Sequence, residues 1–398
     1  MNVLHLCTKV PFPAKDGGAL AIISFARLLQ MDGHTVTILA ANTSKHFQED
    51  VPSETDGISV HAVKVPAAVS LPGIIYNLLF SKAPYNVTRF RNNVFAEALI
   101  GLISKNSYDI IQLEGLHMGV YLPEIRKYSN TRVVLRAHNI EHLLWENIKN
   151  ETSSLFKRYY LSILAKRLRN FETELMSEVD AVVAISESDL KAILKFSKPL
   201  QCIAIPFGIY LAHYPQQEEG MENSLFFIGA LDWIPNQKGL IWFLDNVWPK
   251  LRNDCPQVHL HVAGRNAPAW IADRLKKQKI NFYGEIANAP KFISEFQIQI
   301  VPLFSGSGIR IKILEGMAMG KAIVATSKAA EGIEITPGKE LMIADDVESF
   351  VQNIKDLLTD KHKRISIGAE ARAFISKEFD NLALANKVGS FYRKLIPV

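Results

Sequence analysis

The stretch SGSGIRIKILEGMAMGKAIVAT, Ser305 to Thr326, places a glycine-rich loop, two cations and one carboxylate in a strand-loop-helix pattern. Gly306 and Gly308 permit backbone conformations and close approaches that side chains forbid, and we expect Ser307 to cap the following helix. The free N–H groups and the macrodipole at the start of that helix favour an anion. The stretch therefore predicts a phosphate-binding loop.

Three charged residues extend this prediction to a nucleotide. Arg310 and Lys312 fall in or near the first helical turn, where cations oppose the macrodipole unless an anion binds. Glu315 follows one turn later, where a carboxylate can accept hydrogen bonds from the vicinal hydroxyls of a ribose. The alternative is an ordinary loop followed by a solvated helix face.

Length and composition describe a globular chain of two domains. The 398 residues exceed one compact core, and 48% hydrophobic with 21% charged residues is an ordinary globular balance. The formal charge of +5 is mild and lacks the basic stripe of a nucleic-acid-binding protein, so we expect no nucleic acid partner.

The cysteines and the chain start indicate a cytoplasmic protein. Cys7, Cys202 and Cys255 are scattered and odd in number, which is typical of a reducing compartment. We recognise no signal peptide after Met1 and no apolar stretch of about 18 residues that would span a bilayer.

The alternation of short β-branched runs with helical patterns predicts an α/β fold with parallel sheets in two tandem Rossmann-like domains. The chain pattern breaks at Pro206–Ser224 and then the alternation restarts. We expect a first Rossmann-like domain over 1–206, a linker over 207–223, a second Rossmann-like domain over 224–378 and a C-terminal helix over 379–398 that returns to the first domain. The strands expected in the first domain are Val3–Thr8, Thr35–Ala40, Ile58–Val65, Ile110–Glu114, Arg132–Ala137, Ala181–Ile185 and Cys202–Pro206.

Ligands of open α/β sheets bind beyond the carboxyl ends of the strands, so we searched those loops for polar residues. Gly17 and Gly18 follow the first strand and fit either a ligand-binding loop or a simple turn. His138 follows the fifth strand and could donate to a sugar hydroxyl or to a departing phosphate. His142 is interpreted as structural, and a metal site built on it with Glu141 lacks a third ligand at fitting spacing.

The second half offers further candidates at strand ends. Gly264 and Arg265 follow one strand and supply a second cation for a phosphate, and Gly284 with Glu285 could read a base edge. Asp232, Asn236 and Lys238 lie after another strand, and we interpret Lys238 as a solvated lysine. Since the chain contains no Asp-X-Asp triplet, which commonly holds a metal ion, we expect no metal and no cofactor.

These residues together resemble a known family. The chain is similar over nearly its whole length to the retaining GT-B glycosyltransferases of family four, also called group-one glycosyltransferases. The segment from Gly306 to Thr326 resembles the family's donor-binding loop, with Glu315 at the second glutamate of its E-x7-E motif. Ser307 stands where the first glutamate is usual, as in a GSG-type branch, and Ala230 stands where an arginine is usual. RAHNIEH resembles the segment that carries the family's active-site histidine, here His138.

The resemblance implies a fold with an interdomain cleft and transfer of a sugar from a UDP- or GDP-sugar to an acceptor hydroxyl with retention. It implies that the domain over 1–206 binds the acceptor and that the domain over 224–378 binds the nucleotide sugar. It also implies His138, Arg310 and Lys312 as catalytic residues. The implied donor-binding residues are Gly17, Gly18, Arg265, Gly284, Glu285, Ser307, Gly308 and Glu315.

Two segments, 74–91 and 156–169, mix aromatic and basic residues, as surfaces that lie on anionic lipid do. We therefore expect a glycan or lipid-linked acceptor at the inner membrane face, in cell-surface polysaccharide biosynthesis. The alternative is that both segments are ordinary helices, with aromatic side chains packed into the core and charged side chains in solvent. Among other functions, a nucleotide-sugar epimerase and a non-catalytic sugar-binding protein stay open, whereas the missing GxGxxG disfavours an NAD(P) oxidoreductase.

Overall fold

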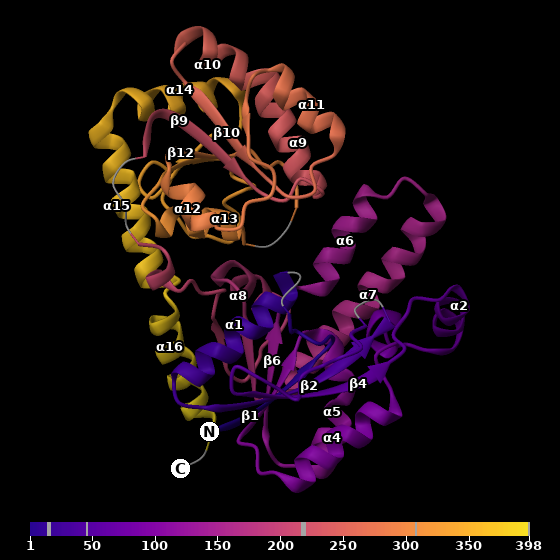
Figure 1. The fold of residues 1–398 in the computed structure, drawn as a ribbon. Helices are drawn as coiled ribbons and strands as arrows, with labels where there is room; N and C mark the ends of the chain where they lie inside the picture. The colour runs from indigo at the N-terminus through magenta and orange to yellow at the C-terminus, as the bar shows by residue number, and fades with distance from the viewer. Residues whose placement is uncertain (14–16, 45–46, 216–219, 307–308, 397–398) are drawn as a thin grey trace. The chain divides into compact units, whose positions relative to one another are not determined.

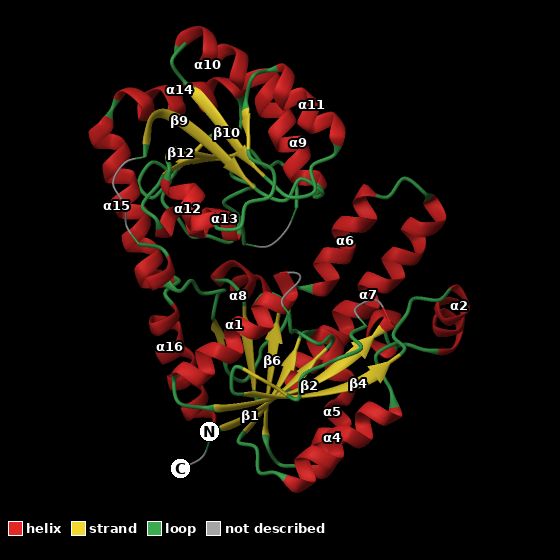
Figure 2. Cartoon of the chain, viewed as in Figure 1, coloured by secondary structure: helices red, strands yellow, loops and turns green. Residues whose placement is uncertain are grey.

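The fold is described from a computed structural model of residues 1–398, except 14–16, 45–46, 216–219, 307–308 and 397–398 (Figure 1). The chain forms two compact units, Met1–Phe207 with Leu384–Val398 and Gly208–Ala383. Each unit is an α/β structure with its own sheet, which confirms the predicted fold class (Figure 2). Among the described residues, no helix has the length and apolar character needed to cross a bilayer.

The first unit is built on an eight-stranded sheet of order β3-β4-β2-β1-β5-β6-β7-β8. All its pairings are parallel except that of β3 with β4. Its strands are β1 (Asn2–Cys7), β2 (Thr35–Thr43), β3 (Glu54–Thr55), β4 (Ile58–Val65), β5 (Ile110–Glu114), β6 (Arg132–Ala137), β7 (Ala181–Ala184) and β8 (Cys202–Ala204). Its helices are α1 (Gly17–Met31), α2 (Leu71–Phe80), α3 (Tyr85–Thr88), α4 (Asn93–Lys105), the 3-10 helix η2 (Leu116–Tyr121), α5 (Leu122–Tyr128), α6 (Glu141–Glu151), α7 (Leu155–Glu178), α8 (Glu187–Ile193) and α16 (Asn381–Leu395).

Strand alternation divides the core of this unit between the two faces of the sheet. Leu4 and Leu6 of β1 pack with residues of α4, α5 and α7. Val3 and Cys7 pack on the opposite face with α1 and with Val388 of α16. The last helix therefore completes the core of the first unit.

The second unit contains a parallel six-stranded sheet of order β11-β10-β9-β12-β13-β14. Its strands are β9 (Met221–Ile228), β10 (His259–Ala263), β11 (Asn281–Phe282), β12 (Phe296–Val301), β13 (Ala322–Ala325) and β14 (Met342–Ile343). Its helices are η3 (Leu211–His213), α9 (Ile234–Trp242), the π-helical turn η4 (Phe243–Val247), α10 (Trp248–Asp254), α11 (Ala269–Lys277), α12 (Ala289–Ser294), α13 (Ile311–Ala318), α14 (Val347–Thr359) and α15 (Lys361–Glu378). β9 begins at Met221, inside the segment predicted to be linker.

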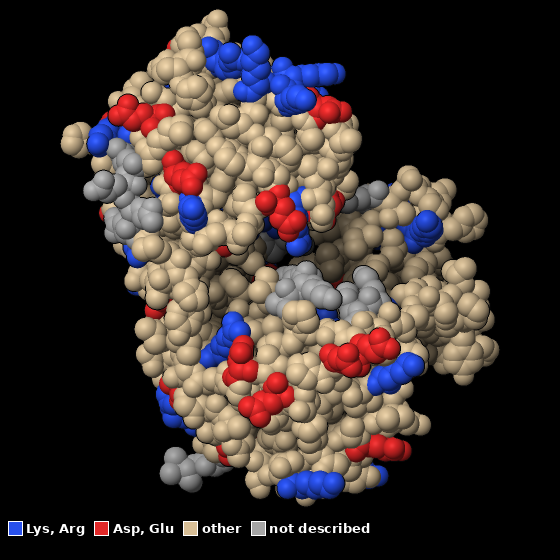
Figure 3. Space-filling model, in the orientation of Figure 1, with Lys and Arg blue, Asp and Glu red and all other residues tan. Residues whose placement is uncertain are grey.

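The charged surface of the second unit is uneven on the face shown in Figure 3. Lysine and arginine side chains gather over α10 and α11, whereas the rest of that face carries both signs. The last turn of α11 carries Arg274, Lys276 and Lys277.

Candidate functional site

The second sheet has a topological switch point at β9. From β9 the chain proceeds to β10 and β11 on one side, and later to β12, β13 and β14 on the other. Loops that leave neighbouring strands in opposite directions open a crevice at the carboxyl ends, which is where ligands of such sheets bind. The loop that carries the predicted phosphate site follows β12, so the structure places it at this switch point.

The helix of the predicted phosphate loop begins later than the sequence indicated. α13 starts at Ile311, and Arg310 occupies the N-cap position without a side-chain capping bond. The prediction that Ser307 caps this helix is therefore wrong, because a cap must directly precede the first helical residue. Ser307 and Gly308 themselves lie outside the described residues. The N–H groups at the start of a helix lack intrahelical partners.

Arg310 is held between the loops that follow β9 and β12. Its side chain is buried, and its guanidinium lies 5.5 Å from the ring centroid of Trp233. Gly306 adopts a φ of 101°, and a Cβ there would lie 2.9 Å from the Trp233 ring. Glycine is thus required twice over at Gly306, by its conformation and by the ring beside it. Burial lowers the pKa of Arg310 from its usual value.

Lys312 lies beside Arg310 and has a neutral partner. Its Nζ donates to Oδ1 of Asn236 at 2.8 Å and lies 4.7 Å from the ring centroid of Phe227. A Cβ on Gly229 would come within 2.5 Å of that Nζ, so glycine at the end of β9 makes room for the ammonium. Burial and then the neighbouring Arg310 lower the pKa of Lys312 to about 7. The charged form of Lys312 is therefore disfavoured in the empty protein, and a bound anion would stabilise that form.

Glu315 stands one turn beyond Lys312 and is half-buried. Its Oε1 accepts a hydrogen bond of 2.9 Å from the hydroxyl of Tyr214. The segment around Tyr214 is fixed in turn, because Arg372 of α15 donates to the Tyr214 carbonyl at 2.7 Å and also to the carbonyl of Ala318. Burial raises the pKa of Glu315. The structure therefore brings Arg310, Lys312 and Glu315 to one strand-loop-helix corner.

The other candidates of this unit lie in adjoining loops. The N–H of Gly264 donates to the carbonyl of Gly284 at 2.8 Å, and Leu231 donates to the carbonyl of Arg265 at 2.9 Å. These bonds connect the loops after β9, β10 and β11. Gly284 has a φ of 64°, and the side chains of Arg265 and Glu285 are exposed. Lys238 is also exposed, on α9, while Asn236 is the buried partner of Lys312.

The first unit holds the remaining candidates near its own switch point, between β1 and β5. Gly17 and Gly18 are the first residues of α1, which follows β1. His138 follows β6, and its Nε2 lies 2.6 Å from Oε2 of Glu114. His142 is buried with its Nδ1 2.6 Å from Oε2 of Glu172, as its structural interpretation expected.

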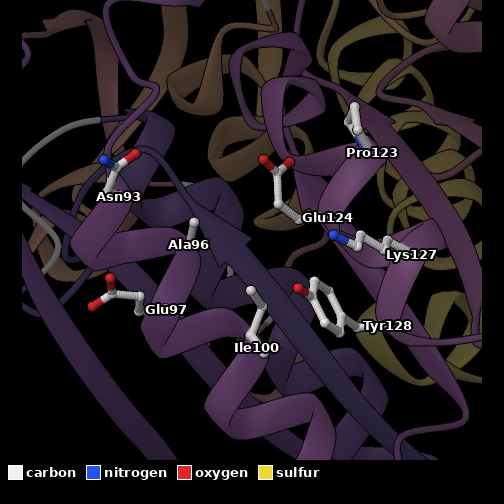
Figure 4. Close-up of a pocket in the computed structure, with 8 residues that line it drawn as sticks. All are labelled: Asn93, Ala96, Glu97, Ile100, Pro123, Glu124, Lys127 and Tyr128. Atoms are coloured by element: carbon white, nitrogen blue, oxygen red, sulfur yellow. The ribbon is translucent and has the colours of Figure 1, made fainter.

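A cavity of about 350 Å³ lies elsewhere in the first unit, between α4 and α5 (Figure 4). Its lining includes Asn93 and Glu97 of α4 together with Glu124, Lys127 and Tyr128 of α5. None of the predicted site residues is among the lining residues. Among the side chains that the structure describes, no group of three His, Cys, Asp or Glu residues is arranged to hold a metal ion.

Comparison with known proteins places this geometry in a family. The family described as Glycosyltransferase Family 4 matches residues 15–213, and the family described as Glycosyl transferases group 1 matches residues 222–360. The two units have the GT-B glycosyltransferase fold. The chain belongs to the group 1 glycosyltransferases of family 4.

Relatives cover almost the whole chain. A Klebsiella pneumoniae protein described as "Uncharacterized 44.6 kDa protein in cps region" is 25% identical and covers 96% of this chain and 97% of its own length. Sucrose-phosphate synthase from Thermosynechococcus elongatus has a TM-score of 0.71 at 17% identity, with 99% of each chain covered. Anabaena HepE in complex with UDP has a TM-score of 0.67 at 15% identity, with 99% of this chain and 100% of that chain covered. A mutant of S. aureus TarM, in complex with fondaparinux, alpha-GlcNAc-glycerol and UDP, has a TM-score of 0.66 at 11% identity, with 98% and 100% covered.

The lowered pKa of Lys312 leads to a prediction about proton uptake. Above about pH 7 the empty protein holds Lys312 mostly neutral, so a bound diphosphate should draw a proton onto it. Calorimetry of UDP or GDP binding near pH 8, in buffers of different ionisation enthalpy, should show uptake of up to about one proton. Lys312→Met should abolish the uptake, and a binding heat independent of the buffer would contradict the prediction.

The lowered pKa of Lys312 also predicts how the free energy of unfolding of the empty protein changes with pH. The pKa of Lys312 in the folded state lies below the usual lysine value, so the unfolded chain binds more protons between the two pKa values. The free energy of unfolding should therefore rise as the pH increases from about 7 to about 10, by an increment that Lys312→Met removes.

Proposed function

We propose that this protein transfers a sugar from a UDP- or GDP-sugar to a hydroxyl of a glycan or lipid-linked acceptor, with retention at the anomeric carbon. The observation that carries the proposal is the corner of α13, where Arg310 and Lys312 lie next to each other and Glu315 follows one turn later. A diphosphate with its ribose matches this order of two cations and one carboxylate. The UDP complex of HepE supports a nucleotide donor.

The proposed mechanism needs charge stabilisation rather than a protein nucleophile. As the bond from the sugar to the diphosphate breaks, negative charge grows on the leaving group, and Arg310, Lys312 and the N–H groups of α13 stabilise it. The acceptor hydroxyl attacks from the same face and passes its proton to the departing phosphate. His138 binds a sugar hydroxyl, and Gly17, Gly18, Arg265, Gly284, Glu285, Ser307 and Gly308 complete the proposed donor site. We propose that the reaction needs no metal.

The relative from a cps region supports a role in cell-surface polysaccharide biosynthesis. The test is a hydrolysis screen across UDP- and GDP-sugars in the absence of acceptor, with and without EDTA. Release of nucleoside diphosphate and an α-sugar from an α-linked donor is the expected result. An epimerised nucleotide sugar, or binding of free sugars without nucleotide turnover, would contradict the proposal.

We also propose that the protein is cytoplasmic and that its first unit contacts anionic lipid at the inner face of the membrane. Apolar side chains on α2 and on the first turn of α7 are highly exposed, among them Leu71, Phe80 and Phe156 at 75%, 73% and 91%. Lys157 and Arg158 are exposed beside Phe156. Aromatic rings with neighbouring cations are suited to the headgroup region of an anionic bilayer.

The membrane proposal predicts salt-sensitive binding to vesicles. Wild-type protein should float with phosphatidylserine vesicles at low salt and separate from them at high salt, since the cations are exposed. Phe156→Ser should weaken flotation, whereas Trp270→Ser on α11, also exposed, should leave it unchanged. If equal amounts of wild-type protein are recovered in the floating fraction with and without vesicles, the proposal is contradicted.

A further inference from the structure

A buried carboxylate lies at the switch point of the first sheet. Glu114 is the last residue of β5, and its side chain has no exposure. Strand alternation places it on the face of the sheet that α1 and α16 cover, together with His5 of β1, Gln112 of β5 and Arg136 of β6. A charged group in such a position requires hydrogen-bonding partners.

The described neighbours supply these partners to both oxygens. Oε1 accepts from the amide of Gln112 and lies 3.1 Å from Nδ1 of His5. Oε2 lies 2.6 Å from Nε2 of His138 and 3.6 Å from Nη1 of Arg136. Burial alone would raise the pKa of Glu114, but Arg136, the hydrogen bond with His138 and the nearby His5 hold it well below its usual value. Glu114 is therefore an ionised carboxylate that only accepts hydrogen bonds.

The partners are themselves fixed, so the carboxylate cannot easily turn away. Arg136 donates to the carbonyl of Ala21 at 2.8 Å and lies 4.2 Å from the ring centroid of Phe25, both on α1. Gln112 accepts a hydrogen bond from the hydroxyl of Tyr392 on α16. The network connects the sheet to both helices on this face and ends at His138.

His138 differs from the other carboxylate-paired histidines of this unit. The side chain of His5 has no exposure, and those of His34 beside Asp32 and of His142 beside Glu172 are 6% and 5% exposed. That of His138 keeps 18% exposure although its Nε2 is bound to a fully buried carboxylate. Part of the His138 side chain therefore stays accessible to a ligand, which the buried His5 and His142 do not offer.

We infer that Glu114 is a positioning residue that keeps a hydrogen of the His138 ring on Nε2 and leaves Nδ1 as an acceptor for a sugar hydroxyl. Because a carboxylate supplies no hydrogen, the hydrogen between the two groups must belong to the ring. This inference rests on the proposed function for the identity of the ligand. The ring tautomer itself does not depend on that function.

The first test is therefore made on the wild-type protein without substrate. Long-range ¹H–¹⁵N spectra of protein labelled with ¹⁵N-histidine report the tautomer of each neutral ring, and His138→Ala identifies the resonances of His138. The expected result is a ring with its hydrogen on Nε2. A ring with its hydrogen on Nδ1 would overturn the inference, whether or not any sugar transfer is found.

The second test separates positioning from structure. Glu114→Gln keeps the shape but adds an amide donor, and it should lower turnover by about 10- to 100-fold, the range known for partners that orient metal-bound histidines. In a His138→Ala background the same change should lower turnover by less than about twofold, since the two residues act as a unit. An equal loss in both backgrounds would overturn the positioning role.

Asp180→Asn provides a matched control. Asp180 is a half-buried carboxylate that accepts from Arg126, Arg132 and the N–H of Val133, at the amino ends of β6 and β7. Its isosteric change should lower the free energy of unfolding and leave turnover unchanged. If no nucleotide sugar is turned over by the wild type, the proposed function fails, and the tautomer measurement still decides the inference about Glu114.

Discussion

Arg310→Ala is expected to lower the rate of sugar transfer by about a hundredfold or more. Removal of one preorganised hydrogen-bond donor that stabilises the transition state has an effect of this size. The guanidinium is buried against Trp233 and precedes α13 directly, so its charge adds to that of the helix start. Negative charge on the leaving diphosphate is larger in the transition state than in the bound donor. The loss should therefore appear mainly in kcat, measured with a donor found in the hydrolysis screen.

Two further variants sharpen this prediction. Arg310→Lys keeps the charge but not the planar guanidinium that lies over Trp233, so it should recover only part of the rate. Lys276→Ala removes an exposed cation at the end of α11 and should leave the rate unchanged. A fully active, correctly folded Arg310→Ala enzyme would refute the assignment of the phosphate site.

Glu315→Ala is expected to lower kcat/KM by about a hundredfold or more, which corresponds to the loss of more than one hydrogen bond to a charged acceptor. Its carboxylate is half-buried and oriented by Tyr214, so it can accept from two ribose hydroxyls without reorganising. Tyr214→Phe removes the orienting bond alone and should cause a smaller loss.

A donor analogue identifies the group that Glu315 binds. The 2′-deoxy nucleoside diphosphate lacks one of the two ribose hydroxyls, so wild type should bind it more weakly than the parent nucleotide. The Glu315→Ala variant should discriminate much less between the two ligands. If the variant discriminates as well as wild type does, Glu315 does not contact the ribose.

The sequence predicted most of the fold because its strands are short runs rich in apolar residues, buried along their whole length in β5 and β12 and only in part in β4. The ranges Ile58–Val65, Ile110–Glu114 and Arg132–Ala137 were predicted to the residue. Parallel strands covered on both faces are continuous apolar runs, and glycines and polar residues mark their ends. The start of α13 was predicted wrongly because Ser307 has the side chain of a typical helix cap, whereas the helix begins at Ile311 with Arg310 in the N-cap position.

The contacts of the site were less predictable. Asn236 and Lys312 are far apart in the sequence, and only the pairing of β9 with β12 brings their elements together. Trp233 and Tyr214 carried no sequence pattern that linked them to Arg310 or Glu315. Glu114 did leave a pattern, because polar residues recur in otherwise apolar strands at positions that share one face of the sheet.

The return of α16 to the first unit has a practical consequence for dissecting the enzyme. In the order of the chain, residues 208–383 are an insertion, and the polypeptide passes between the units twice. A fragment that stops at Phe207 would lack Val388 and Tyr392, and its first sheet would expose the apolar face that they cover. Residues 208–383 are accordingly the excisable fragment, whereas an intact first half requires residue 207 to be spliced to residue 384.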